Sequence, residues 1–197
     1  MSDTAAWLAL VAVAVATSIV SGVMGLAGGM LLLSALLLRL DPLVAIPVHG
    51  VVQLVSNASR AWFQRRHVRW DAVWRFAWPL LPAGAAGLAL LRSVPPDAGR
   101  LGIGLFVLAL ELGPQASIGT IAACQIFQHG SKLALFGAAG FDFARYALPL
   151  AGLCAGAVAG SAIGTRLLDR LPERAFRLAV RLLLSALALE LVLDGVH

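Results

Sequence analysis

Apolar segments long enough to cross a lipid bilayer follow one another along almost the whole chain. A spanning helix needs about 20 mainly apolar residues. Of the 197 residues, 60% are hydrophobic and only 13% are charged, whereas soluble domains have about 25% charged residues. The composition therefore predicts a single membrane domain over residues 1–197 with an all-α fold, a polytopic helical membrane protein. Six segments are predicted to span the bilayer: 42–63, 72–91, 98–112, 114–136, 143–165 and 174–193.

The N-terminal segment differs from the others because glycines interrupt its apolar run. Trp7 to Leu38 is longer than one span requires, and the stretch SGVMGLAGG at 21–29 contains four glycines, which weaken a helix. Two half-membrane helices meeting there would form a re-entrant hairpin, whose broken backbone must be buried in protein or line a polar cavity. The alternative is one long tilted helix with a glycine-rich packing face. The run lacks a positive n-region, so we expect it to be retained rather than cleaved as a signal peptide.

The basic residues predict how the spans are oriented. Residues 60–75 contain five arginines and residues 166–181 contain five more, whereas the gaps on the opposite side hold five basic residues in total. Six antiparallel spans place both arginine-rich segments on one side, which the excess of basic residues predicts to be cytoplasmic. The net charge of +5 thus indicates a multi-pass protein of the cell membrane that contacts the lipid bilayer, and not a nucleic-acid-binding protein.

Two stretches resemble each other at an offset of 72 residues. LDPLVAIPVHGVVQLVSNASR at 40–60 aligns with LGPQASIGTIAACQIFQHGSK at 112–132, and the alignment pairs Pro42 with Pro114, Gln53 with Gln125, and Arg60 with Lys132. Each half contributes three spans, an odd number, so the halves are predicted to be inverted repeats. The first repeat covers about 5–112 and the second about 113–197.

Each repeated stretch carries polar residues along one face of its predicted helix. In the first, they recur at i, i+4, i+7 and i+11 from His49, ending at Arg60. Gln53 and Gln125 fall near the bilayer midplane, where an amide needs a partner or water and by default marks a functional path. Hydrogen bonding between helices is the alternative.

Neutral amides, hydroxyls and imidazoles suit an oxyanion, because they donate hydrogen bonds without trapping it in a buried ion pair. A helix N-terminus at the glycine-rich break would add partial positive charge. The predicted substrate-binding residues are Gly28, Gly29, His49, Gln53, Ser56, Asn57, Gln125, Gln128 and His129. The two histidines are also candidates for a proton relay.

No residue pattern indicates catalysis, a metal site or a cofactor, and we expect none of these. Cys124 and Cys154 lie in apolar segments without nearby ligands, which indicates buried thiols. Asp71 and Asp142 are predicted at helix starts. Four tryptophans are predicted as anchors at the membrane interface: Trp62, Trp70, Trp74 and Trp78.

The sequence resembles the TauE/SafE sulfite exporter family of membrane permeases. The resemblance rests on SGVMGLAGGM at 21–30, on the stretch from Pro42 to Val48, on the polar QLVSNAS that follows, and on the second-half counterpart. It implies two inverted repeats of four segments, each opening with a segment that dips into the membrane. This chain departs from that pattern, because LALEL at 108–112 runs directly into GPQAS and the second glycine-rich opening segment is absent.

The resemblance implies a secondary transporter, and not an enzyme, for small anions that contain sulfur, such as sulfite or organosulfonates. The alternative is a non-transporting membrane scaffold or interaction protein derived from the same fold. The missing opening segment leaves open whether a homo-oligomer is needed, with a second protomer supplying the absent part.

Overall fold

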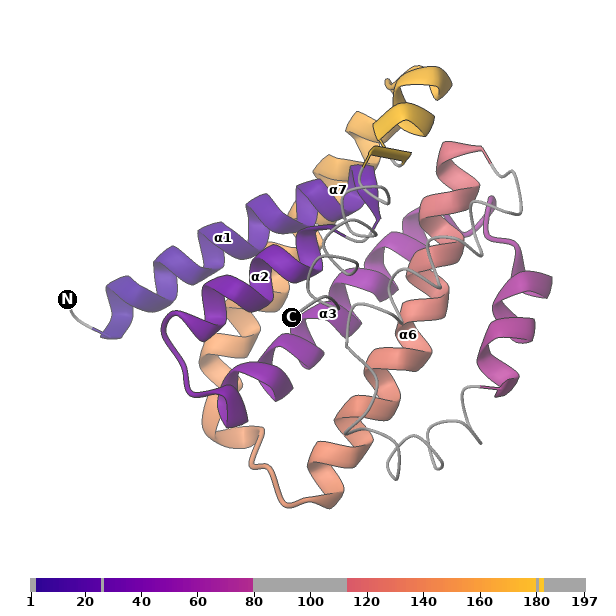
Figure 1. Ribbon diagram of the computed structural model, residues 1–197. Coiled ribbons are helices and arrows are strands. Elements are labelled where there is room, and N and C mark those ends of the chain that lie inside the picture. Colours follow the sequence, from indigo (N-terminus) through magenta and orange to yellow (C-terminus); the bar gives the residue numbers. More distant parts are fainter. Residues whose placement is uncertain (1–2, 26, 80–112, 180, 183–197) are drawn as a thin grey trace, which may run out of the picture.

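The computed structural model describes residues 3–25, 27–79, 113–179 and 181–182. Within these ranges every regular element is a helix (Figure 1), in agreement with the all-α prediction. The elements are α1 (Asp3–Met24), α2 (Ala27–Leu37), α3 (Pro42–Phe63), α6 (Pro114–Ala138), the short 3-10 helix η1 (Ala144–Tyr146) and α7 (Ala147–Leu168). Residues 70–79 and 173–179 are also helical. The predicted segment 98–112 lies outside the described residues, as do most of 72–91 and much of 174–193.

The N-terminal segment is a hairpin of two helices and not one long helix. Gly25 lies between them with a φ of 81°, which glycine adopts readily and other residues rarely do. A Cβ added to Gly28 of α2 would lie 1.8 Å from the Thr17 carbonyl oxygen of α1, so the two helices touch through their backbones. Whether the hairpin re-enters a membrane stays a prediction.

The two arms of this hairpin have unequal lengths. Helix α1 has 22 residues and α2 has 11, which correspond to about 33 Å and about 16 Å of helix. The prediction of two half-membrane arms is therefore wrong for α1, which is long enough to cross a bilayer. The reason is that Gly22 does not break the helix. A Cβ on Gly22 would lie 2.8 Å from the Gly164 Cα of α7, so this glycine serves close packing and α1 continues to Met24.

Helices α3 and α6 begin where the sequence predicts, because both have proline at the first position. The N–H that proline lacks has no intrahelical partner at that position. Asp41 caps α3, since its Oδ1 accepts a hydrogen bond of 2.8 Å from the Leu43 N–H. Pro114 starts α6 in the same way after an extended Gly113. Both helices exceed 20 residues.

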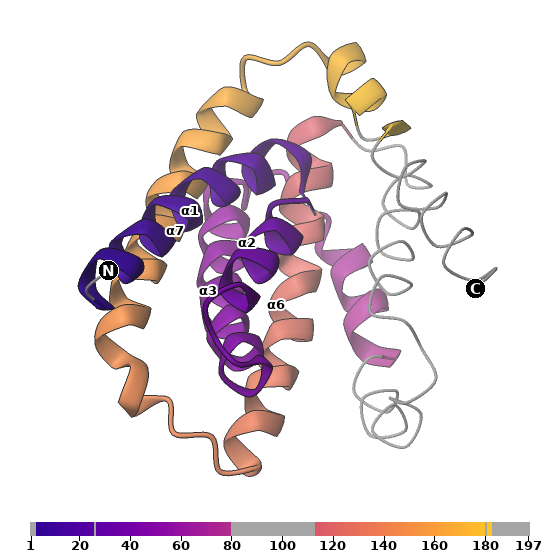
Figure 2. The same ribbon diagram turned by 60° about the vertical axis from the view of Figure 1, so that its left-hand side comes forward.

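The helices pack in two pairs, one antiparallel and one parallel. Helices α3 and α6 are antiparallel, since Gly50 of α3 faces Leu133 of α6 while Gln64, just after α3, faces Gly119. Helices α1 and α7 run parallel (Figure 2). Here the facing pairs advance together along both helices, from Val11 with Gly152 to Ile19 with Gly164.

The contact between α1 and α7 is made by backbone. Four glycines spaced four apart line this face of α7: Gly152, Gly156, Gly160 and Gly164. A Cβ added to Gly160 would lie 2.3 Å from the Val15 carbonyl oxygen, and one added to Gly164 would lie 2.7 Å from that of Ile19. Small residues at this spacing allow two helices to approach closely within a membrane.

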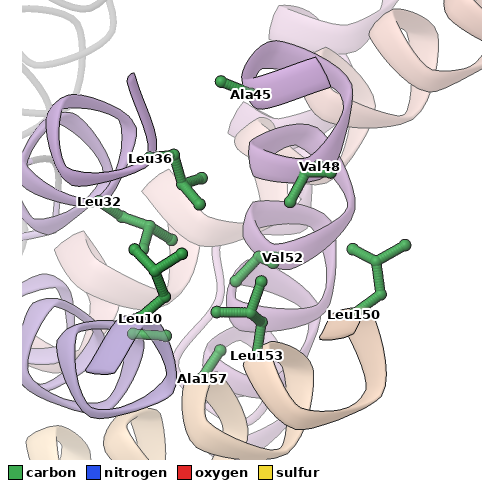
Figure 3. Close-up of a cluster of buried hydrophobic side chains, with 10 residues drawn as sticks. Leu10, Leu32, Leu36, Ala45, Val48, Val52, Leu150, Leu153 and Ala157 are labelled. Atoms are coloured by element: carbon green, nitrogen blue, oxygen red, sulfur yellow. The ribbon is translucent and has the colours of Figure 1, made fainter. Parts of the chain in front are cut away.

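An apolar core fills the space where α1, α2, α3 and α7 meet (Figure 3). Leu32 and Leu36 of α2 project towards Val52 of α3 and Leu153 of α7, and all four side chains are fully buried. This core lies beside the first half of α3. It fixes the position of α2 and therefore the position of the break that precedes it.

Both arginine-rich segments lie at one end of the bundle, beside the first turns of α6. The Arg69 N–H donates to the Thr120 hydroxyl at 3.1 Å, and Gln115 Nε2 donates to Asp169 Oδ1 at 3.3 Å. This placement agrees with the prediction that the two segments share a side. The assignment of that side to the cytoplasm and the inverted repeat stay predictions.

Two described helices are long and apolar enough to cross a membrane by length and composition, over Ala5–Met24 and Ala144–Leu168. Within their most apolar windows only 33% and 39% of the residues are buried. Most residues in these windows are therefore partly or fully exposed, unlike those of a soluble core helix, which is mostly buried. Helices α3 and α6 are as long, but they carry polar residues and are not among these two apolar helices. The number of six spans stays a prediction.

Candidate functional site

The polar face of α3 is buried inside the bundle. Its side chains are exposed by 4% or less: His49 by 2%, Gln53 by 4%, Ser56 by 1%, Asn57 by 0% and Arg60 by 0%. Buried polar groups are costly unless they are hydrogen-bonded. What this face does therefore depends on which groups each side chain meets.

The first half of this face lies against the hairpin. His49 Nε2 donates to the Gly29 carbonyl oxygen at 2.9 Å, which places a proton on Nε2 because a carbonyl can only accept. A Cβ added to Gly29 would lie 3.3 Å from Gln53 Oε1. The Gln53 amide is thus beside the first turn of α2, whose N–H groups give that end of the helix partial positive charge. Three predicted site residues gather here.

Gly28 has different surroundings from Gly29. An added Cβ would lie 1.8 Å from the Thr17 carbonyl oxygen and 2.3 Å from Ser21 Oγ. Gly28 therefore packs against α1, while Gly29 faces the polar residues of α3. The predicted role of Gly28 as a direct substrate contact stays a prediction, and the structure gives it a packing role.

Helix α6 contributes a second set of polar residues. Gln125 is 8% and His129 is 6% exposed, and the His129 ring meets the His49 ring edge to face with centroids 5.8 Å apart. Gln128 is partly buried, and its backbone carbonyl accepts a hydrogen bond from Ser131. The histidine pair thus connects the two predicted polar faces directly.

Ser56 joins three helices through hydroxyl groups. Its Oγ lies 3.4 Å from Ser18 Oγ of α1 and 3.3 Å from Ser161 Oγ of α7. Ser161 Oγ also donates to the Ser56 carbonyl oxygen at 3.4 Å. These long contacts form a small hydroxyl cluster behind the amides of α3.

Arg60 lies inside the bundle and not in an exposed segment between spans. Its Nη1 donates to the carbonyl oxygens of Ser21 at 2.7 Å and Gly25 at 3.0 Å. Its Nε donates to the Ser56 carbonyl oxygen at 3.4 Å, and its Nη2 donates to Asn57 Oδ1. Counting Arg60 among the basic residues of the 60–75 segment was therefore wrong. The residue falls in the last turn of α3, on the face that meets the end of α1.

The residues predicted at helix starts and at the membrane interface lie at the periphery. Arg69 donates to both carboxylate oxygens of Asp71, at 2.9 Å and 2.8 Å, and these hydrogen bonds hold the pKa of the Asp71 carboxyl below its ordinary value. Asp142 Oδ1 accepts a hydrogen bond from the Ala144 N–H at 3.0 Å and so caps η1. The predicted anchors are exposed, by 65% for Trp62, 48% for Trp70, 61% for Trp74 and 79% for Trp78.

Comparison with known families identifies the fold that holds this buried polar face. The family model described as Sulfite exporter TauE/SafE matches residues 10–112, just over half of the chain. The chain belongs to the TauE/SafE family. No curated protein and no solved structure matches it. Membership in TauE/SafE, a family of membrane transporters, supports a lipid-facing role for the outward apolar faces of α1 and α7.

The TauE/SafE match includes the α1–α2 hairpin and all of α3, and it ends at residue 112, just before α6 begins. The glycine-rich break and the buried polar face of α3 are therefore inside the matched part. Gln125, Gln128 and His129 are outside it.

Among the buried polar residues of this TauE/SafE protein that were not predicted as site residues, three have side chains that contact the polar face of α3 or belong to it: Ser18, Ser161 and Arg60. The spacing of Arg60 from Ser56 indicated the right helix face, but its place at the end of the apolar segment suggested a surface position. Ser161 follows Gly160 in the run of glycines spaced four apart. That spacing was the signal that α7 has a buried face.

Proposed function

We propose that this protein is a secondary transporter of small sulfur-containing oxyanions, such as sulfite or organosulfonates, as a multi-pass protein of the cell membrane. The observation that supports this most is a buried face of hydrogen-bond donors, neutral except for Arg60, beside a broken helix in a member of the TauE/SafE family. Gly29, His49 and Gln53 would contact the anion on one side, with Gln125, Gln128 and His129 on the other.

The chemistry of this face suits an anion. Amide and imidazole N–H groups donate hydrogen bonds to oxygen atoms that carry negative charge. The first turn of α2 adds the partial positive charge of a helix N-terminus. Among the described residues, the buried polar side chains include no carboxylate, so none of them repels an anion.

Transport requires that this buried site opens to each side in turn. The antiparallel crossing of α3 and α6 would bring equivalent positions of two inverted repeats together at one site near the bilayer midplane, as in other transporters of that construction. Gln53 and Gln125 lie near the middle of their helices, at the same depth in this arrangement. Rocking of one half against the other would then expose the two amides alternately.

The direct test is flux into proteoliposomes that contain the purified protein. We expect uptake of labelled sulfite or of a labelled sulfonate that saturates with concentration, and no such uptake in protein-free vesicles. Substituting both amides, Gln53→Ala with Gln125→Ala, should reduce the flux by at least about tenfold, since two polar contacts are lost at the site. Gln115→Ala is the matched control, because this glutamine of α6 bonds to Asp169 at the end of the bundle. Unchanged flux in the double variant would refute the proposed site.

A non-transporting scaffold is the second candidate. It is favoured by one observation, that the family model matches residues 10–112 only while half of the proposed site lies on α6. If no sulfite, sulfonate or sulfate crosses the vesicle membrane in either direction, the scaffold function is supported and the transport function is refuted.

A further inference from the structure

Arg60 is a buried cation whose charge is only partly compensated. The side chain is 0% exposed, and none of the described carboxylates forms an ion pair with it. Removing a guanidinium from water is costly unless other groups replace the lost solvation. The arrangement around Arg60 therefore needs an explanation beyond ordinary surface charge.

The carbonyl oxygens that Arg60 meets belong to the end of α1. Ser21 and Gly25 supply two of its acceptors, at the terminus of a helix that ends at Met24. Basic side chains often bond to the last carbonyls of a helix. The C-terminus of a helix carries only about half of a negative charge, so the Ser21 and Gly25 contacts leave part of the positive charge uncompensated.

Two nitrogen atoms at this position have N–H groups without an acceptor among the described residues. A guanidinium has five N–H groups, and the described acceptors of Arg60 account for four of them, which leaves one on Nη2. Asn57 Nδ2 is also buried and has no partner among the described residues. The two donors are neighbours, because Asn57 Oδ1 accepts from the same Nη2. Capping of α1 explains the carbonyl contacts and leaves these two donors unexplained.

We propose that Arg60 and Asn57 form the charged end of an oxyanion-binding site, with Arg60 Nη2 and Asn57 Nδ2 each donating to an oxygen of the anion. The class of ligand is a small anion with two or more oxygens on one atom, as in a sulfite, sulfonate or sulfate, because a guanidinium and a neighbouring amide match such a pair of oxygens. The inference rests on the proposed function, since it adds a positively charged residue to the same site.

The experiment measures the rise in melting temperature of the purified, detergent-solubilised protein as sulfite, sulfate or methanesulfonate is added, with chloride at equal ionic strength as the blank. Asn57→Asp is the main variant. It replaces the free amide by a carboxylate beside Nη2, which mimics the bound anion, so the protein should stay folded. The apparent affinity for added anion should fall by at least about tenfold, since a charge-assisted contact is lost.

Arg60→Lys is the second variant. Lysine retains the positive charge but has one ammonium group in place of the two terminal nitrogens of the guanidinium. It should also reduce the affinity, whereas Arg65→Lys, at an exposed position over the Trp62 ring, should leave it unchanged. A role limited to capping α1 predicts that Asn57→Asp binds each anion as the wild type does, and that result would overturn the proposal. The absence of any anion-dependent shift in the wild type would overturn it too.

The outcomes also separate this site from the proposed function. Anion binding that depends on Arg60 and Asn57, in a protein that transports none of the anions, would retain the site and refute transport. Sulfite flux that is equal in the wild type and in Asn57→Asp would retain transport and refute the site.

Discussion

The bundle contains two helix pairs that are held together in different ways. Helices α1 and α7 touch through glycine backbones, so closely that a Cβ added to Gly160 would lie only 2.3 Å from the Val15 carbonyl oxygen. Helices α3 and α6 meet in part through polar side chains, where the His49 and His129 rings are 5.8 Å apart. The first contact depends on shape and tolerates no added atoms. The second depends on hydrogen-bonding groups that can exchange partners. We infer that the α1–α7 pair is the rigid part of the molecule and that the α3–α6 pair is where a ligand acts.

The largest effect is expected from breaking the rigid pair. Gly160→Leu would place side-chain atoms where the Val15 carbonyl oxygen now lies, and we expect a loss of about 3 kcal/mol or more in the free energy of unfolding, at the upper end for overpacked sites. Ala159→Leu is the control, because that residue is exposed on the same helix. Reversible unfolding in mixed micelles measures both, and equal stability would refute the rigid contact.

A smaller but more specific effect is expected from the two adjacent glycines of the break. Gly28→Ala should lower stability by about 2–3 kcal/mol, because its Cβ meets the fixed Thr17 carbonyl. Gly29→Ala should change stability by less than about 1 kcal/mol, since alanine favours helix and its Cβ meets only the movable end of Gln53. Sulfite flux should nevertheless fall in Gly29→Ala, because Gln53 is displaced. Equal thermal stability of the two variants would contradict this distinction.

A weak coupling is expected where the two helix pairs meet. The Ser56 hydroxyl lies 3.3 Å from that of Ser161, a long contact of a kind that contributes about 0.6 kcal/mol on average between membrane helices. A double-mutant cycle of Ser56→Ala and Ser161→Ala should give a coupling near this value. A coupling several times larger would contradict this and show that the hydroxyl cluster contributes strongly to the packing of α7 on α3.

The smallest effect is expected outside both pairs. Asp71→Asn removes the exposed pair with Arg69, and such pairs contribute little, so the melting temperature at pH 7 should not change measurably. Arg69 lowers the pKa of the Asp71 carboxyl. Any stabilisation is therefore present at neutral pH and is lost only as the pH falls through that lowered pKa. A melting temperature that differs from the wild type near pH 7 would refute this.

Local sequence signals predicted the helices whose first residue is a proline. Helix α3 was predicted at 42–63 and observed at Pro42–Phe63, and the start of α6 at residue 114 was also predicted, because aspartate or glycine followed by proline marks a helix start. Helix α7 begins at Ala147, later than the predicted 143, since Asp142 first caps a turn of 3-10 helix.

Contacts between distant segments could not be predicted in the same way. The parallel packing of α7 on α1 depends on glycines in two segments more than a hundred residues apart, and it was not predicted. The burial of Arg60 depends on where α1 ends, which Gly25 determines. Gln53 was predicted as an amide near the bilayer midplane, and its side chain is buried. No sequence pattern revealed that it would lie beside Gly29 in the first turn of α2.

The parallel α1–α7 contact has a consequence for how the protein is made. Helix α1 leaves the ribosome first, and its partner emerges only after residue 147 has been synthesised. Until then the face of α1 that carries Val11, Val15 and Ile19 lacks the glycines of α7 against which it packs. Assembly of the rigid pair is therefore a late event in biosynthesis, since contacts between distant parts of a chain must wait for the whole intervening segment. A ribosome stalled before α7 would hold a membrane-inserted chain whose first helix is still without its partner.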